Sequence, residues 1–415
     1  MDRRQLLKSL ALGGTAGLLP LSRGWAIESG RSAAPRLIVV MLRGAIDGLN
    51  VVVPYRESNY YQLRGSIAIP KPGTDGGAFD LDGRFGLHPA LSSLMPLWQS
   101  QQLAFVHAAG SPDPTRSHFD AQDYLESGTP GVKNTADGWM NRLLGALPTR
   151  GGALRAVSLG PVLPRIVSGT NTVASVPLGR SAARKTALDR PGVGAAFDRL
   201  YAENSALGAA YREGRDAHQQ VLADLNSADI SPEANVADNG APPPRGFALD
   251  AAQLATLILR NPGLQLAFMQ IGGWDTHVNQ GGSQGQLANR LTALGNGLQT
   301  LTTQLGPELA NTMIVVLSEF GRTAKQNGNG GTDHGHGNVI WLLGGGLHGG
   351  KVHGDWPGLD DSALHEQRDL AVTSDYRSVL AQVSERHLRL NDRQLATVFP
   401  QAPASTTGIS TLLRS

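Results

Sequence analysis

The stretch "RLIVVMLRGAIDG", residues 36–48, decides the fold class of this chain. After Arg36 it runs through uninterrupted apolar residues as far as Leu42, so it offers no polar face to water. Such a run predicts a strand that is buried on both sides, as in a parallel sheet covered by helices. Arg43 follows directly and Asp47 comes shortly after it, so polar side chains are expected where this strand ends.

Similar apolar runs recur along the chain. They are "LAFVHAAG" (103–110), "LQLAFMQIGG" (264–273), "MIVVLSEFG" (313–321) and "NVIWLLGGG" (338–346). Helical patterns lie between them, at about residues 117–127, 193–226, 248–260, 283–305 and 374–388. The alternation predicts an α/β fold in which a mostly parallel central sheet is sandwiched between helices.

We expect one large domain over residues 27–415. Residues 130–190 are rich in Gly, Ala and Pro, which predicts an irregular insertion in that domain. Residues 228–246 lack apolar periodicity and contain three consecutive prolines, which predicts a long surface loop.

Composition excludes several classes of protein. The formal net charge is +2, and no basic stripe is interleaved with aromatic residues, so we expect no nucleic-acid partner. Cysteine is absent, which excludes disulfides, thiolate metal sites and cysteine nucleophiles.

The first residues, "MDRRQLLKSLALGGTAGLLPLSRGWAIES", have the features of an export signal. Arg3 and Arg4 precede an apolar stretch, and Gly24 and Ala26 suit a signal-peptidase site. The pattern resembles the twin-arginine signal, although Asp2 stands where Ser or Thr is usual. The alternative is a membrane anchor, but the apolar stretch is short and contains glycine. We therefore expect a signal peptide over residues 1–26, the twin-arginine translocase as export partner, a periplasmic or secreted protein, and no stable membrane span.

Polar groups follow the predicted strands at the points where open α/β sheets bind ligands. The segments are "RGAIDGLN", "GSPDPTRSHFDAQDY", "GGWDTHVNQ", "SEFGR" and "GTDHGHGN". The candidate metal ligands in them are Asp47, Asp275, His277, Glu319, Asp333, His334 and His336. Carboxylate and imidazole groups without thiolates suit Zn²⁺ or Mn²⁺, and suit Ca²⁺ less well.

Some of these residues have an ordinary structural alternative. Asp47 before Gly48 has the form of a turn aspartate. Ser117 with Asp120 three residues later resembles a helix-capping arrangement, although a helix N-terminus also favours an arriving anion. His334 and His336 could also be exposed side chains of a surface loop that bind no metal.

These segments together resemble the signature blocks of the exported bacterial family called domain of unknown function 1501. The resemblance runs over nearly the whole mature chain. That family looks like a branch of the alkaline phosphatase and sulfatase superfamily, so the resemblance implies a central sheet between helices with metals at the strand ends.

The superfamily pattern also implies residue roles. Asp47 matches the place of a metal-binding aspartate, Ser117 or Thr115 that of the nucleophile, and Asp275 with His277 that of a later ligand pair. The next strand usually ends in Ser-Asp-His-Gly, but here Glu319 replaces the aspartate and Phe320 the histidine. The phenylalanine puts a complete second metal site in doubt.

The histidines of "GTDHGHGN" allow two alignments. His334 and His336 match the late histidine ligand of the superfamily, which is the alignment we favour. Alternatively, Asp333, His334 and Gly335 are the displaced Asp-His-Gly motif.

The implied activity is hydrolysis of a phosphate or sulfate ester, in a small molecule or a polysaccharide, by a metal-activated serine. In that reading Ser117 attacks, Arg116 or Arg43 stabilises charge on the non-bridging oxygens, and His118 donates a proton to the leaving group. The alternative is a non-catalytic exported protein of the same fold that keeps a metal site for stability or binding.

Overall fold

The computed structural model of the chain describes residues 34–148, 154–160, 162–178, 191–202, 205, 207–209, 211–216, 238–403 and 410–414. The predicted signal peptide, residues 1–26, lies outside the described residues, as do residues 228–237 of the predicted loop at 228–246. Among the described residues, no helix is both long enough and apolar enough to cross a membrane.

The strand β1 (Arg36–Leu42) lies inside a sheet that has nine strands in the described part of the chain. It pairs in parallel with β8 (Leu266–Ile271) on one side and β9 (Thr312–Ser318) on the other. The strand order is β11-β5-β10-β9-β1-β8-β6-β7, and β12 also pairs with β5. Only the two pairings of β10 (Asn338–Gly344) are antiparallel among the described strands of this sheet. The predicted mostly parallel central sheet is confirmed.

The remaining strands complete the two sides of the sheet. They are β5 (Leu103–Gly110), β11 (Lys351–His353) and β12 (Ser374–Asp375) beyond β10, and β6 (Ala156–Leu159) and β7 (Ala174–Val176) beyond β8. Thus part of the segment at 130–190, which the sequence predicts as an insertion, extends the central sheet. A small separate sheet contains β2 (Val52–Val53), β4 (Gly86–Leu87) and β3 (Phe79–Asp80).

Both faces of the central sheet are buried, because alternate side chains of each strand point to opposite sides. In β1, Ile38 and Val40 belong to one apolar cluster, and Leu37 and Val39 belong to another. Burying such a side chain fully contributes about 1.5–3 kcal/mol, which explains why the strand is apolar throughout.

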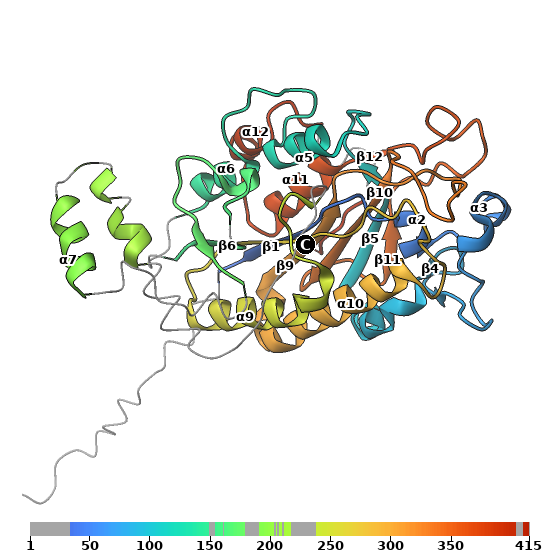
Figure 1. Cartoon of the computed structure of the whole chain (residues 1–415), viewed down its shortest axis with the longest axis horizontal. Coiled ribbons are helices and arrows are strands. Elements are labelled where there is room, and N and C mark those ends of the chain that lie inside the picture. The colour runs from blue at the N-terminus through green and yellow to red at the C-terminus, as the bar shows by residue number, and fades with distance from the viewer. Residues whose placement is uncertain are drawn as a thin grey trace, which may run out of the picture. The chain divides into compact units, whose positions relative to one another are not determined.

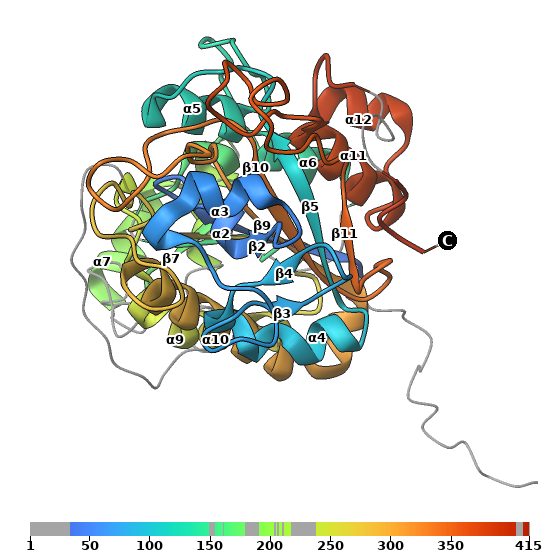
Figure 2. The ribbon, with the colours of Figure 1, turned by 90° about the vertical axis from the view of Figure 1, so that its right-hand side faces the viewer.

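Helices cover each face. The apolar cluster of Ile38 and Val40 also contains residues of α4 (Met95–Gln99), α9 (Phe247–Arg260) and α10 (Gln286–Leu305). The cluster of Leu37 and Val39 contains residues of α5 (His118–Ser127), α6 (Trp139–Ala146), α11 (Tyr376–Arg386) and α12 (Asp392–Val398). Figures 1 and 2 show these two groups on opposite sides of the sheet. Further helices are α2 (Gly48–Val51), α3 (Ser58–Arg64) and α7 (Pro191–Leu200), and residues 207–209 and 211–216 are also helical.

The reversal of β10 positions the candidate site. The parallel strands β1, β5, β8 and β9 end at the same edge of the sheet, and an antiparallel strand begins there. The loop between β9 and β10 therefore stays at that edge. This loop contains residues 331–337.

Candidate metal centre

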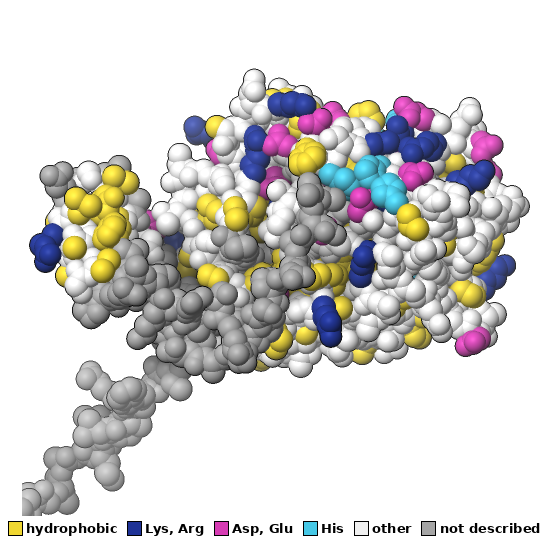
Figure 3. Space-filling model, viewed as in Figure 1, with side chains coloured by type: hydrophobic (Ala, Val, Ile, Leu, Met, Phe, Trp, Pro, Cys, Tyr) yellow, Lys and Arg dark blue, Asp and Glu magenta, His cyan; other side chains and the backbone are white. Residues whose placement is uncertain are grey.

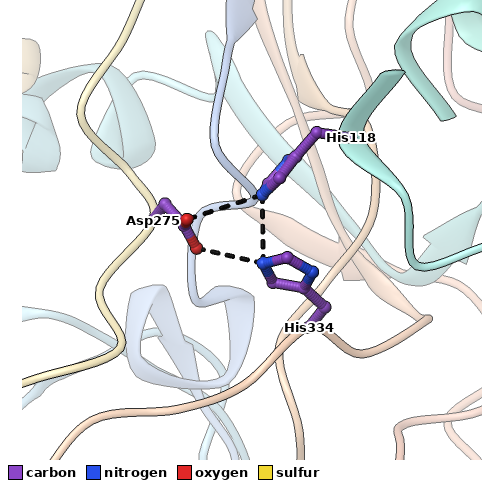
Figure 4. A group of neighbouring side chains, drawn as sticks. All are labelled: His118, Asp275 and His334. Carbon is purple, nitrogen blue, oxygen red and sulfur yellow. Dashed lines mark hydrogen bonds and ion pairs between the residues drawn. The ribbon is translucent and has the colours of Figure 1, made fainter. Parts of the chain in front are cut away.

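Three side chains meet at this edge: His118, Asp275 and His334. One ligand atom of each lies within 4.8 Å of the others. Nε2 of His118 is 3.1 Å from Nε2 of His334, which is 3.2 Å from Oδ1 of Asp275. Figure 4 shows the three side chains pointing toward one another from three separate segments. Together, these three side chains could bind one metal ion.

Each of the three follows or precedes an element of the central fold. His118 is the first residue of α5, which follows β5, and Asp275 lies in the loop after β8. His334 lies before β10 and is paired with Arg322, which follows β9, through a β-bridge. The cluster is therefore assembled from chain segments that are far apart in sequence and held by the buried sheet.

Two glycines allow the loop at 331–337 to lie close to other backbone. A side chain at Gly331 would come within 2.4 Å of the His277 carbonyl group, and one at Gly335 within 2.4 Å of the Arg322 carbonyl carbon. Neither contact is sterically possible, so both positions require glycine. The close approach of the backbone at these two glycines places His334 next to the loops that follow β8 and β9.

His277 is a fourth member at the rim of the group. Its Nε2 is 2.9 Å from Oδ1 of Asp275 and 3.0 Å from Nε2 of His334. Its side chain is 39% exposed, whereas that of His118 is 12% exposed. Figure 3 shows histidine side chains gathered in one patch on this face of the protein, with acidic side chains beside them.

In His118, His277 and His334, the ring nitrogen Nδ1 is hydrogen-bonded to an oxygen atom that can only accept a hydrogen bond. Nδ1 of His118 lies 2.8 Å from Oε1 of Glu319, and Nδ1 of His277 lies 3.0 Å from Oδ1 of Asp333. Nδ1 of His334 lies 2.9 Å from the carbonyl oxygen of Arg116. In each neutral ring the proton is thus on Nδ1, and the lone pair is on Nε2.

This arrangement fits a metal ion. Imidazoles that bind metals usually donate their other N–H to a carboxylate or carbonyl, as these three do. Ligands of a tetrahedral zinc ion lie about 3.3 Å apart when each bond is about 2.0 Å long, close to the separations of 3.0–3.2 Å here. Two or three imidazoles with one carboxylate suit Zn²⁺ or Mn²⁺ better than Ca²⁺, which prefers oxygen.

Without a metal, charges within the group interact strongly. Burial lowers the pKa of His118, but the carboxylates of Asp275 and Glu319 outweigh it and raise this pKa to about 9. Burial opposes ionisation of Asp275, yet hydrogen bonds from His118, His334 and Arg322 lower its pKa. The site therefore favours an ionised aspartate and attracts positive charge.

Two predicted ligands lie in positions that support an imidazole. Glu319 is fully buried, and its Oε1 accepts hydrogen bonds from His118, from Gln122 Nε2 at 3.0 Å and from the Gly44 amide at 2.8 Å. Asp333 accepts from His277 and from Asn327 Nδ2 at 3.0 Å. Both carboxylates orient a histidine. Burial opposes ionisation of Glu319, but the hydrogen bonds from His118 and Gln122 outweigh it and lower the pKa of Glu319. The pKa of Asp333 is lowered mainly by the hydrogen bond from the Asn327 amide.

Two other predicted ligands are engaged elsewhere. Asp47 is fully buried, forms an ion pair with Arg64 and accepts from Gln280 Nε2 at 2.6 Å. His336 is buried too, and its Nε2 bonds the carbonyl oxygen of Ser111 at 2.9 Å. The structure does not bring Asp47 or His336 into the cluster of His118, Asp275 and His334.

The predicted nucleophiles lie directly before His118. Ser117 is exposed and caps α5, because its Oγ accepts from the Asp120 amide at 3.5 Å. Thr115 Oγ1 accepts from the Ser117 amide at 3.3 Å. Both hydroxyls therefore occupy the turn that leads into the helix.

The two arginines predicted to stabilise charge are held by acidic residues. Arg116 bonds Asp369 and Glu366, each at 2.6 Å from Nη2. Arg43 is fully buried and forms an ion pair with Glu126 at 2.8 Å. Neither guanidinium group is directed by these contacts to the cluster.

No supporting role was predicted from the sequence for the residues that hold the ligands in place. Arg322 donates to Oδ1 of Asp275 at 2.6 Å, and Asn327 bonds both Asp333 and the His277 carbonyl oxygen. The ring of Phe320 packs 4.9 Å from that of His118, so it forms an apolar wall of the site. The position of Asn327 in the same glycine-rich loop as His334 was the one signal available for it.

Comparison with known families supports the resemblance drawn from the sequence. The family model described as "Protein of unknown function (DUF1501)" matches residues 84–399, which is most of the chain. The chain belongs to the DUF1501 family. A search of curated proteins finds no match to this DUF1501 chain.

Solved structures similar to the DUF1501 chain share little sequence with it. Ps i-CgsB in complex with k-i-k-neocarrahexaose is 12% identical, with a TM-score of 0.40, covering 90% of this chain and 75% of that one. The PsFucS1 sulfatase from Pseudoalteromonas sp. is 13% identical, with a TM-score of 0.38, covering 91% and 74%. The C-terminal periplasmic domain of EcEptC from Escherichia coli, in complex with Zn, is 11% identical, with a TM-score of 0.34, covering 75% and 73%.

Proposed function

We propose that this DUF1501 chain is an exported, metal-dependent hydrolase of phosphate or sulfate esters. The observation that carries the proposal is the convergence of Nε2 atoms beside Asp275, with Nδ1 of each imidazole bonded to an oxygen acceptor. The lone pairs of these nitrogens face one another, and a divalent cation is the simplest partner for all of them.

We assign His118, Asp275 and His334 as the ligands, with His277 at the rim. A bound Zn²⁺ or Mn²⁺ would supply Lewis acidity toward the ester oxygens and would favour an ionised nucleophile near neutral pH. In this assignment His118 holds the metal, and it does not act as the proton donor expected from the sequence. Glu319 and Asp333 fix the orientation of the rings.

Ser117 is the proposed attacking group. Its hydroxyl is exposed at the start of α5, next to His118, and the capping bond that it accepts leaves its own proton free to be lost. Attack of Oγ on phosphorus or sulfur would break the bond to the leaving oxygen and leave the acid group on serine. The amides in the first turn of α5 would stabilise the negative oxygens, since Arg43 and Arg116 are tied to carboxylates.

A non-catalytic role is the second candidate, and Phe320 favours it. Phe320 fills the place of an expected histidine and offers no ligand atom, and its ring also packs 5.2 Å from His334. A protein of this kind would keep one metal for stability or for binding.

Two measurements test the proposal on the purified mature protein. Elemental analysis gives the metal content, and a panel of 4-nitrophenyl phosphate and sulfate esters gives the activity. Hydrolysis that disappears in His334→Ala and persists in His348→Ala would support the hydrolase, since His348 bonds only a backbone carbonyl away from the cluster. Tight metal binding without hydrolysis of any ester would favour the non-catalytic candidate.

A further inference from the structure

A cavity of about 390 Å³ adjoins the candidate metal centre. Asp333 belongs to both, because it lines the cavity and holds Nδ1 of His277. The cavity size is within the usual range of sites for small ligands, at its lower end. A molecule in this cavity would therefore lie beside the histidine cluster.

The cavity wall is connected to the cluster by a second route. Arg368 lines the cavity and bonds Asp369 at 3.2 Å, and Asp369 in turn bonds Arg116. The carbonyl oxygen of Arg116 accepts from His334. Both His277 and His334 are thus held by residues that line this cavity or bond to its wall.

Several polar groups of the wall are available to a ligand. The side chains of Lys325, Asp361 and Gln367 are exposed and make no hydrogen bond or ion pair with other described residues. They offer an ammonium donor, a carboxylate acceptor and an amide that can do both. Figure 3 shows basic and acidic side chains intermixed next to the histidine patch, on the side toward α3.

The mixture of charges selects the chemistry of the occupant. The positive charges of Lys325 and Arg368 are balanced by the negative charges of Asp333 and Asp361, so the wall has no net charge that favours an ion of either sign. A neutral polyol suits the wall groups that remain available, because each hydroxyl donates one hydrogen bond and accepts others. Leu63 and Leu364 also line the cavity and offer apolar surface to the C–H face of a sugar ring.

We propose that this cavity binds the neutral glycosyl part of a sugar phosphate or sugar sulfate, with the charged ester group at the histidine–aspartate cluster. This inference rests on the proposed hydrolase function, which it narrows to carbohydrate esters. The groups that recognise the sugar are Lys325, Asp361 and Gln367. These contacts do not distinguish a phosphate ester from a sulfate ester.

Binding of neutral sugars tests the cavity without relying on catalysis. Saturation-transfer NMR is recorded on the mature protein with methyl glycosides of glucose, galactose, mannose and N-acetylglucosamine. At least one glycoside should bind the wild type and the Lys351→Ala control, whose changed lysine is exposed on β11. The double variant Lys325→Ala/Asp361→Ala should bind it about tenfold more weakly, because two polar contacts are lost.

Activity gives the second readout. The double variant should lose about tenfold in kcat/KM for D-glucose 6-phosphate or 6-sulfate, whereas the Lys351→Ala control should keep the wild-type value. If no glycoside binds the wild type, or if the double variant binds it as tightly as the control, the cavity proposal is wrong. If the 4-nitrophenyl esters are not hydrolysed by the wild type, the hydrolase proposal fails, while the NMR result still decides whether the cavity binds sugar.

Discussion

Nε2 of His277 lies 3.0 Å from Nε2 of His334, and the Nδ1 atom of each ring is bonded to an oxygen. Two neutral imidazoles in this arrangement present lone pairs to each other, because the oxygens keep the protons on Nδ1. The repulsion is relieved if a divalent cation binds between the rings. The arrangement of this pair therefore favours metal binding.

Replacing His334 should remove the metal. His334→Ala deletes the imidazole that contacts both His118 and His277, so we expect the purified variant to contain little Zn or Mn by elemental analysis. A metal present at 100 times its Kd stabilises the wild type by about 2.7 kcal/mol, and this increment should vanish in the variant. His348→Ala is the matched control. Equal metal content in both variants would rule out the assigned centre.

The carboxylates behind the histidines should tune metal affinity without being ligands. Asp333→Asn keeps the shape of the side chain but weakens the hold on Nδ1 of His277, and such changes typically cost about 10–100-fold in affinity. Metal titration followed by calorimetry measures the change. Asp355→Asn, at an exposed position, is the control. Complete loss of metal in Asp333→Asn would instead make Asp333 a ligand.

Asp47 should prove structural. Its carboxylate is fully buried against Arg64 and Gln280, and removing one partner of a buried ion pair typically costs about 3–5 kcal/mol. We expect Asp47→Asn to lower the free energy of unfolding by about this amount in urea titrations, yet to retain its metal. A variant of normal stability that has lost its metal would return Asp47 to the ligand set expected from the sequence.

The metal-free protein should become less stable as the pH rises toward 9. The pKa of His118 in the folded state is raised from 6.5 to about 9, so its protonated form stabilises the fold. This stabilisation is fully present below pH 6.5 and is lost as the pH rises through about 9. Thermal melts of chelator-treated protein from pH 6 to 10 measure it. His118→Asn should flatten the profile in this window, and an unchanged profile in that variant would assign the dependence to another group.

The fold, and the sheet edge that holds the candidate site, could be predicted because buried strands leave a clear pattern. The run at 338–346 became β10 (Asn338–Gly344), and the others agree similarly with β1, β5, β8 and β9. Strand direction could not be read, since an apolar run reports burial and not orientation, so the reversal of β10 emerged only from the structure. Short strands were expected within residues 130–190, but the places of β6 and β7 in the central sheet were not predicted, because their few residues carry no long apolar run.

The roles within the site were harder to predict than its members. Asp275 and Glu319 are both carboxylates after a strand, but only the fold shows that Glu319 is directed at Nδ1 of His118. The pairing of Asp47 with Arg64 depends on α3 bringing Arg64 to the loop after β1, which no local pattern reveals. Residue type and spacing identify which groups can bind metal, whereas tertiary contacts decide which of them are free to do so.

The choice between Ser117 as nucleophile and Ser117 as helix cap can be decided by one pair of variants. Ser117→Ala should abolish hydrolysis of a responsive ester, because Oγ is the proposed attacking atom. It should cost only about 0.5–2 kcal/mol of stability, the usual loss for a cap, since the side chain accepts one long bond from the Asp120 amide. Thr115→Ala removes a hydroxyl that accepts from the Ser117 amide, so it should disturb the turn and reduce turnover much less.

Rates and covalent trapping together distinguish the possible attacking groups. Steady-state rates are measured at saturating metal, and acid-quenched reactions are examined by mass spectrometry for a phosphorylated or sulfated Ser117 peptide. A dead Thr115→Ala with an active Ser117→Ala would transfer the nucleophile to Thr115, which occupies the same turn before α5. If both variants keep full activity and no modified peptide is trapped, neither hydroxyl attacks. Water would then be the nucleophile, and Ser117 would be only the cap that its bond to the Asp120 amide makes it.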